Sequence, residues 1–294
     1  MLVQDKLQSG EHFTEVDRRI ADYLLARGEG LRGETVRQIA ARLYVAPSSV
    51  MRLAQKLGYD GFNALRDDYL KEIEYLSSHF RQLDPNYPFA KGDAEGVMIG
   101  KMLALHQEIL ADCRSLLTPA ALRQAVDLLA RARRICLFGT GTHMGVAADF
   151  VEKMAKIGRE VCPISQTDLA LWKALASGGD TCFILFSYTG ETTAALSLAR
   201  QLKKQGIPFI AVTSYGANSL SALGDCVLYL STREKLTQNL GAFGTTVSMV
   251  FLLDLLYSCL FARDYDRSLA FKMTDTDLYD GRHSKNPILE DDVP

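Results

Sequence analysis

The sequence predicts an α/β protein built from an all-helical N-terminal domain and a second domain with a parallel sheet flanked by helices. From Phe13 to about Leu76, apolar residues recur at helical spacing. From Arg134 onward, short apolar and β-branched runs alternate with helical stretches, which is the pattern of a parallel sheet covered on both faces. The length of 294 residues suits two domains.

Capping residues and helix breakers divide the N-terminal half into helices. Thr14 is a predicted N-cap, with Asp17 three residues later, and Gly28 ends the first helix. Thr35 caps a second helix. Pro47 opens a third, since proline suits the first helical turn.

Turn-forming residues between Asp84 and Asp93 predict an inter-domain linker. A long helix is expected over about 96–116, and another begins at Pro119. Four buried strands are then expected, at Ile135–Phe138, Cys182–Phe186, Phe209–Thr213 and Val227–Leu230.

These signals predict four regions. They are a helical domain over 1–80, a linker and connecting helix over 81–116, an α/β domain over 117–262 and a polar tail over 263–294. The end of that tail is expected to be partly disordered, because it is polar and short of apolar residues.

Composition argues against several classes of protein. A net charge of −2 is unlike that of a chain that binds polyanions indiscriminately. The six cysteines are scattered without a C-x-x-C pair, which predicts reduced thiols in the cytoplasm. The N-terminus lacks the pattern of a secretory signal. The apolar run over 242–262 contains Asp254 and is expected to be a buried helix, so no membrane association is predicted.

Two short helices joined by a tight turn match the geometry that places a recognition helix in the major groove of DNA. The polar residues that could contact DNA are Arg37, Ser48, Ser49, Arg52 and Lys56. Seryl hydroxyls near a helix start can bind phosphate, and an arginine can read guanine. The alternative is that any small helical bundle has this spacing and that the basic residues are merely solvated.

The run TVRQIAARLYVAPSSVMRLAQKLGYDGFNALR resembles the helix-turn-helix of the RpiR family of bacterial sugar-metabolism regulators. Its end, LGYDGFNALR, corresponds to the leucine-glycine-aromatic-x-glycine-phenylalanine tail of that family. The resemblance implies that Tyr59, Gly61 and Phe62 form the turn before the next helix. It also implies a double-stranded DNA operator as partner and a homodimer or homotetramer as the assembly.

Two glycine-containing loops follow predicted strands in the second half. In LFGTGTHMGVA, Gly139 and Gly141 allow the backbone to approach a ligand closely. A nicotinamide site is disfavoured, since the third glycine and the later acidic residue are missing. In FSYTGETT, hydroxyls surround Gly190 just before a helix and form an uncharged cradle for phosphate. An ordinary strand-to-helix turn is the alternative.

The second loop resembles the S-x-S/T-G-x-T signature of the SIS (sugar isomerase) domain, and the resemblance extends over roughly 117–262. It implies that the hydroxyls of Ser187, Thr189 and Thr192 hold the phosphate. It also implies that Tyr188, Gly190 and Glu191 line the second loop. The first loop would contribute Gly139, Thr140 and Gly141. His143 departs from the family, which usually has serine there. Its imidazole could bind a phosphate or sugar hydroxyl, or narrow the pocket.

The expected function is transcriptional regulation of carbohydrate metabolism, with DNA affinity controlled by a phosphorylated sugar and with no cofactor, metal or catalysis. The alternative is a sugar-phosphate isomerase or an amino-sugar-phosphate lyase, which would need an acid/base pair drawn from Glu191, Glu234 and His143. A third possibility is an oligomerisation module that retains the fold without a ligand. Glu234 and Lys235 are further candidates for the sugar end of the pocket.

Overall fold

The computed structural model describes residues 2–10, 12–78 and 83–279. The described chain forms two compact units. Unit 1 consists of residues 1–116, 214–222 and 229–245, and unit 2 of residues 117–213, 223–228 and 246–294. Each unit contains segments that are distant in sequence, because the chain leaves unit 2 twice and returns.

Unit 1 is mainly helical. Its helices are α1 (Val3–Ser9), α2 (Glu15–Arg27), the short 3-10 helix η1 (Gly28–Leu31), α3 (Val36–Leu43), α4 (Pro47–Lys56), α5 (Phe62–Ser78) and α6 (Glu95–Leu116). The short helix α11 (Ser219–Leu223) falls mostly in this unit.

Side chains cap α2 and α3 as the sequence predicts. The Thr14 hydroxyl accepts a hydrogen bond from the Asp17 amide at 3.2 Å, and the Asp17 carboxylate accepts one from the Thr14 amide at 3.0 Å. Thr35 and Gln38 form the same reciprocal arrangement at the start of α3. These bonds satisfy amides that a helix start otherwise leaves unpaired. Helices α1–α5 then share one buried core, which includes Leu24, Ile39, Leu53 and Phe62.

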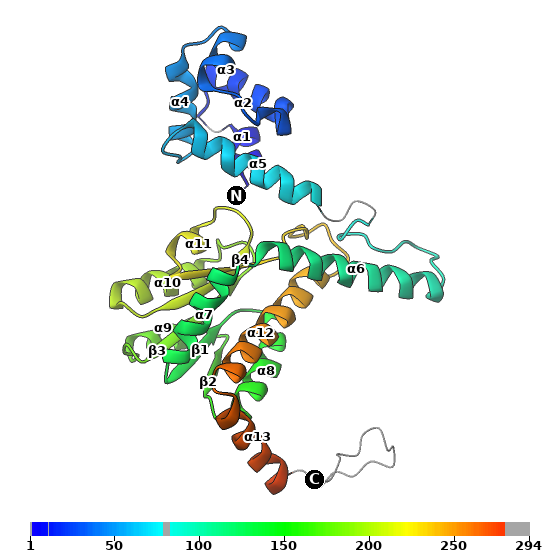
Figure 1. Cartoon of the computed structure of the whole chain (residues 1–294), viewed down its shortest axis with the longest axis vertical. Helices are drawn as coiled ribbons and strands as arrows, with labels where there is room; N and C mark the ends of the chain where they lie inside the picture. The colour runs from blue at the N-terminus through cyan, green and yellow to red at the C-terminus, as the bar shows by residue number, and fades with distance from the viewer. Residues whose placement is uncertain (1, 11, 79–82, 280–294) are drawn as a thin grey trace. The chain divides into compact units, whose positions relative to one another are not determined.

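Unit 2 carries most of a five-stranded parallel sheet with helices on both sides (Figure 1). The strands are β1 (Arg134–Phe138), β2 (Val161–Ile164), β3 (Thr181–Ser187), β4 (Phe209–Ser214) and β5 (Cys226–Leu230). The helices are α7 (Pro119–Arg131), α8 (Thr142–Ala155), α9 (Thr167–Leu175), α10 (Thr193–Gln205), α12 (Phe243–Arg263) and α13 (Tyr265–Tyr279).

The strand order is β2-β1-β3-β4-β5. The chain therefore goes from β1 outward to β2 and then crosses back to β3 on the other side of β1. Phe138, the last residue of β1, pairs with Leu185 near the end of β3. The loops that follow β1 and β3 thus begin side by side at the carboxyl edge of the sheet. In open α/β sheets this reversal of strand order creates the crevice in which ligands bind.

The four predicted strands correspond to β1, β3, β4 and β5, but β2 was not expected. Its four residues include Pro163, and proline is disfavoured in a strand unless the strand lies at a sheet edge. β2 lies at such an edge. The helix α1 was also not expected. The predicted polar tail contains α13, so its first half is helical. The predicted disorder at its end concerns residues 280–294, which lie outside the described residues.

Within the described residues, α12 is the one helix long and apolar enough to cross a membrane by length and composition. Its buried side chains include Met249, Leu252 and Leu256. Asp254 on the same helix accepts a hydrogen bond from Lys153 of α8 at 2.5 Å. The acidic residue is therefore paired within unit 2, and the buried side chains show that one face of α12 packs in the core, with 39% of its apolar stretch buried.

Candidate functional site

In the loop after β1, the backbone at Gly139 passes close to the side chains of His143 and Phe186. A Cβ added there would lie 3.2 Å from the Cβ of His143 and 3.4 Å from that of Phe186, so any larger residue would crowd both loops. Gly141 follows with φ +61° and precedes α8. No side chain caps the start of α8, so its first amides remain available to a ligand.

The loop after β3 is closed by its own hydroxyls. The Ser187 and Thr192 hydroxyls lie 2.8 Å apart. The Glu191 amide donates to the Thr189 hydroxyl at 3.1 Å, and the Gly190 amide donates to the Ser187 carbonyl at 3.0 Å. Gly190 has φ +69°, a conformation that favours glycine. The sequence FSYTGETT therefore folds as a tight turn that leads directly into α10.

The start of α10 also lacks a side-chain cap, although its N-cap residue is Thr192. Two helix starts that no side chain of the described residues caps thus follow adjacent strands at one edge of the sheet. The amides and the partial positive charge of such helix starts suit a phosphate group. Of the remaining predicted residues, Thr140 and Glu191 are exposed and Tyr188 is partly buried.

His143 lies on the first turn of α8, and its ring stacks on Phe186 with centroids 6.3 Å apart. Burial lowers the pKa of His143, which the backbone of Thr140 only partly opposes. The imidazole is therefore neutral at pH 7. Its buried Nδ1 has no hydrogen-bond partner in the described part of the chain. A neutral, unpaired ring nitrogen is suited to a ligand hydroxyl rather than to charge neutralisation.

Glu234 is buried and its carboxylate is engaged within unit 1. Its carboxylate accepts hydrogen bonds from the amides of Gly244 and Thr245, the latter at 2.9 Å, and from the Thr245 hydroxyl at 2.8 Å. These amides belong to the first turn of α12, so Glu234 stabilises that helix start. The neighbouring Lys235 has an exposed side chain.

In unit 1, α3 and α4 are joined by a turn of three residues, 44–46. Arg37 on α3 and Ser48 and Arg52 on α4 are exposed. Ser49 differs from the expectation, because it is only 8% exposed and its hydroxyl accepts a hydrogen bond from Arg52 at 3.2 Å. Ser49 therefore orients the Arg52 guanidinium and does not itself face solvent.

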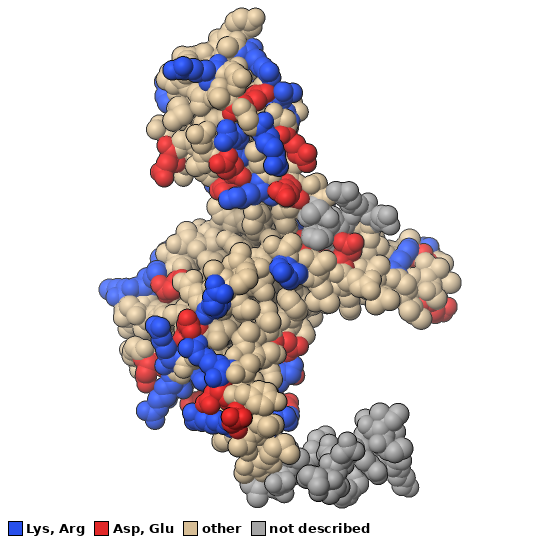
Figure 2. Space-filling model, in the orientation of Figure 1, with Lys and Arg blue, Asp and Glu red and all other residues tan. Residues whose placement is uncertain are grey.

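Lys56 also has a structural contact. Its ammonium group lies 2.5 Å from the Asp17 carboxylate of α2, and Asp17 is buried. Arg42 pairs with Glu34 at 2.8 Å. Basic and acidic side chains stand next to one another over the helices of unit 1 in Figure 2. The positive charge of this region is thus partly neutralised, and Arg37 and Arg52 are left without a carboxylate partner among the described residues.

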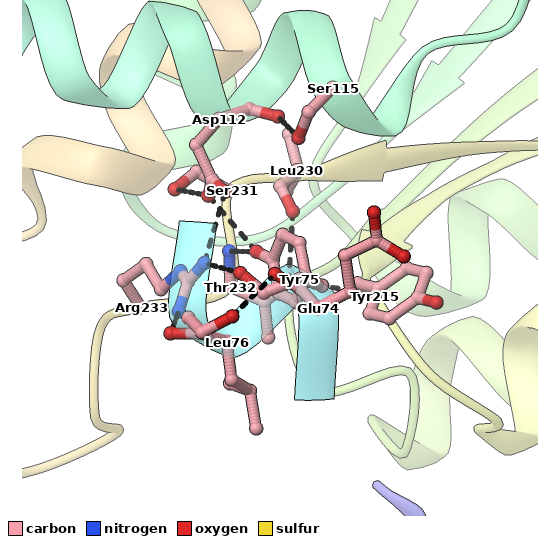
Figure 3. Close-up of polar contacts among 11 residues, drawn as sticks. Glu74, Tyr75, Leu76, Asp112, Ser115, Tyr215, Leu230, Ser231, Thr232 and Arg233 are labelled. Atoms are coloured by element: carbon pink, nitrogen blue, oxygen red, sulfur yellow. Dashed lines mark hydrogen bonds and ion pairs between the residues drawn. The ribbon is translucent and has the colours of Figure 1, made fainter. Parts of the chain in front are cut away.

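A buried polar network that the sequence did not reveal lies in unit 1 (Figure 3). Asp112 of α6 is fully buried, and its carboxylate accepts hydrogen bonds from the Tyr75 hydroxyl at 3.0 Å and the Ser231 hydroxyl at 2.5 Å. The Arg233 guanidinium lies 3.5 Å from the same carboxylate and 4.2 Å from the centre of the Tyr75 ring. Burial beside Asp112 strongly raises the pKa of Tyr75.

The network also fixes the end of α5. Arg233 donates to the carbonyl of Leu76 at 3.1 Å and to that of Tyr75. Such carbonyls at a helix end otherwise lack partners, and a cation there is favourable. The Thr232 amide donates to the Tyr75 hydroxyl at 3.0 Å. The last turn of α5, which extends from the helix-turn-helix core, is therefore joined to the segment after β5 by a paired buried charge.

Comparison with known proteins agrees with this two-part construction. Residues 1–74 match the helix-turn-helix domain of the rpiR family, and residues 128–259 match the SIS domain. The HTH-type transcriptional regulator YfhH of Escherichia coli (strain K12) is 29% identical over 88% of this chain and 91% of its own length. The regulator YbbH of Bacillus subtilis (strain 168) is 25% identical over 90% and 92% of the two chains.

Solved structures share the fold. The NanR protein of Vibrio vulnificus, complexed with ManNAc-6P, superposes with a TM-score of 0.60 at 22% identity, covering 94% of this chain and 97% of its own. The sugar isomerase domain of an RpiR transcription factor from Sphaerobacter thermophilus superposes with a TM-score of 0.55 at 18% identity, covering 62% and 99%.

A helix-turn-helix domain combined with a SIS domain defines a class of DNA-binding transcriptional regulators. The chain belongs to the rpiR family of that class.

Proposed function

We propose that a phosphorylated sugar binds at the carboxyl edge of the sheet and controls the affinity of this regulator for its DNA operator. The observation that carries this proposal is the pair of uncapped helix starts, α8 and α10, behind adjacent strands at the reversal of strand order. That NanR was solved with ManNAc-6P supports the ligand class.

The phosphate is held by backbone amides and hydroxyls without a cation. Ser187, Thr189 and Thr192 supply the hydroxyls, and the glycines at 139, 141 and 190 allow the backbone to approach. His143, neutral and unpaired at Nδ1, accepts or donates one hydrogen bond at the sugar. Tyr188, Thr140 and Glu191 complete the lining.

A thermal-shift screen of hexose, amino-sugar and pentose phosphates, with the unphosphorylated sugars beside them, tests the proposal. A ligand present at about 100 times its Kd stabilises the protein by about 2.7 kcal/mol, which raises the Tm by roughly 5–10 °C. The double variant Ser187→Ala/Thr189→Ala should lose this rise. The control Ser258→Ala removes an exposed hydroxyl of α12 and should keep it. An unchanged rise in the double variant would place the phosphate elsewhere.

We propose that the protein is not an enzyme. An isomerase or lyase needs an acid/base pair near the sugar. Of the three candidate groups, Glu234 is engaged at the start of α12 and Glu191 is exposed, so only the neutral His143 is partly buried beside the glycine loops. Incubation with the same sugar phosphates should give no turnover. Turnover that Glu191→Gln abolishes would establish the alternative function.

DNA recognition is assigned to Arg37, Ser48 and Arg52, which are exposed on α3 and α4. Ser49 supports Arg52, and Lys56 is placed by its pair with Asp17. Arg52 could address a guanine edge bidentately. Its replacement by alanine should therefore weaken binding to the operator more than binding to unrelated duplex DNA.

We further propose that the protein works in the cytoplasm as a homodimer or homotetramer, since symmetric assemblies read paired half-sites. Exposed apolar residues on α6, Ile99 and Leu103, are spaced by one helical turn and offer an apolar stripe for such an assembly. Sedimentation analysis of Ile99→Glu/Leu103→Glu tests this. An unchanged sedimentation coefficient would remove α6 from the interface.

The buried network suggests how the ligand affects DNA binding. β5 ends at Leu230, at the same edge of the sheet as the two loops. In the segment that follows, Ser231 contacts α6 and Arg233 contacts the end of α5. A ligand that shifts the segment after β5 would shift the last turn of α5. The spacing of paired recognition helices would change with it, and with that spacing the affinity for DNA.

A further inference from the structure

Tyr44 has an unusual backbone conformation. It is the C-cap of α3, with φ +52° and ψ +45°, which is the left-handed region that disfavours residues with a Cβ. The turn requires this conformation, because the Val45 amide reaches back to the Ala40 carbonyl at 3.0 Å. Where α1 and α10 end in the same left-handed conformation, the chain has Gly10 and Gly206.

Nothing in the described part of the chain compensates for the tyrosine. Tyr44 is 93% exposed. Its side chain makes no hydrogen bond, ion pair or ring contact with the described residues, although its backbone amide donates to the Ala41 carbonyl at 3.3 Å. A glycine would relieve the strain and would also remove a large apolar surface from water. Strain of this kind, held without internal benefit, points to a contact with another molecule.

The position of Tyr44 indicates that molecule. The turn leads directly into α4, whose N-cap, Ala46, provides no side-chain hydrogen bond. Ser48 and Arg52 are exposed on the same helix. In helix-turn-helix proteins the start of the second helix enters the major groove while the first helix crosses the sugar–phosphate backbone. A residue between the two helices therefore faces the duplex beside that backbone.

We propose that Tyr44 is a DNA-backbone contact, whose hydroxyl donates to a phosphate oxygen while its ring packs on a deoxyribose. This inference deepens the proposed function and rests on it. Contacts of this kind position the protein and do not read sequence. Because the phenol is neutral, it adds affinity without releasing a counterion.

The test uses the full chain and two duplexes, one selected by the protein from a random-sequence library and one of unrelated sequence. Tyr44→Gly should raise the Tm by roughly 2–8 °C, since the left-handed strain is removed. The same variant should bind both duplexes about tenfold more weakly, as expected for a lost hydrogen bond to a charged group. The slope of log K against log salt should stay that of the wild type.

Two further variants isolate the hydroxyl. Tyr44→Phe should keep the wild-type Tm and lose most of the affinity that Tyr44→Gly loses. Tyr87→Phe removes the hydroxyl of another exposed tyrosine, in the linker, and should bind both duplexes as the wild type does. Arg52→Ala should weaken binding mainly to the selected duplex, since Arg52 is assigned to a base edge.

A Tyr44→Gly variant that binds both duplexes within about twofold of the wild type would refute the proposal, as that is well below one lost hydrogen bond. A variant whose oligomeric state changes while its DNA affinity does not would assign Tyr44 to a protein interface instead. Failure of the proposed function is distinguishable, because the wild type would then select no duplex, or Arg52→Ala would bind the selected duplex as the wild type does.

Discussion

Removal of the Asp112 carboxylate tests the buried network most directly. Asp112→Ala deletes the acceptor of the Tyr75 and Ser231 hydroxyls and leaves Arg233, whose side chain is 9% exposed, without its carboxylate. Hydrogen bonds to a charged group contribute about 1.5–3 kcal/mol each. Breaking a buried ion pair on one side costs about 3–5 kcal/mol. The two figures describe overlapping losses, so we expect a destabilisation of about 3–5 kcal/mol.

In a domain of this size, 1 kcal/mol shifts the Tm by about 2–4 °C, so Asp112→Ala should lower the Tm by roughly 6–20 °C. Differential scanning calorimetry of the full chain measures the shift in the transition that contains unit 1. Asp68→Ala is the matched control in unit 1. It removes a carboxylate of α5 that lies 3.9 Å from the Lys71 ammonium group, in a pair whose side chains are 55% and 70% exposed. An exposed pair contributes at most about 1 kcal/mol, so the control should shift the Tm by less than roughly 4 °C.

A second variant separates the effect of the unpaired Arg233 charge from the effect of the lost Asp112 side-chain volume. Arg233→Met added to Asp112→Ala removes the unpaired cation and should restore part of the lost Tm, since the guanidinium no longer lies buried without a counter-charge. If Asp112→Ala lowers the Tm no more than Asp68→Ala does, the carboxylate does not stabilise unit 1 and the reasoning fails.

Three further results are expected. Burial raises the pKa of Asp17, but hydrogen bonds from Lys56 and Thr14 outweigh this and leave the value below 3.8. The pair therefore stabilises unit 1 above that pH and is lost as pH falls below it. Lys56→Met should flatten the loss of Tm measured between about pH 5 and pH 2, and an unaltered pH profile would contradict the assignment. Burial raises the pKa of Cys182 to about 12, so iodoacetamide at pH 8 should label this thiol only after unfolding, as mass spectrometry of the native protein can check. Gly190→Ala places a Cβ at φ +69° and should both lower the Tm by a few degrees and abolish the sugar-phosphate thermal shift, whereas a retained shift would show that the loop tolerates another geometry.

Much of the architecture follows from local sequence patterns. Periodic apolar residues, capping threonines and Pro47 placed α2, α3 and α4 correctly, because these signals act within a few residues of each other. The short apolar runs placed four of the five strands for the same reason. β2 was not predicted, because Pro163 disfavours a strand in the sequence pattern. Only the pairing of β2 with β1 at the sheet edge supports this strand.

The sequence predicted the two loops of the candidate ligand site, but it did not predict that they lie side by side. The strand order and the pairing of Phe138 with Leu185 bring the loops together, and that pairing joins residues far apart in the chain. The sequence could name the hydroxyls at 187, 189 and 192. It could not show that the Ser187 and Thr192 hydroxyls bond to each other or that the start of α10 has no side-chain cap.

The sequence by itself determined the two-part construction, the helix-turn-helix and the glycine loops, since each depends on residues close in the chain. Only the tertiary structure decided the roles of charged and polar side chains. Ser49 is buried against Arg52, Lys56 pairs with Asp17, and Glu234 stabilises the start of α12. A charge or hydroxyl takes its role from the partner and the solvent that surround it, and folding supplies those neighbours from distant parts of the sequence.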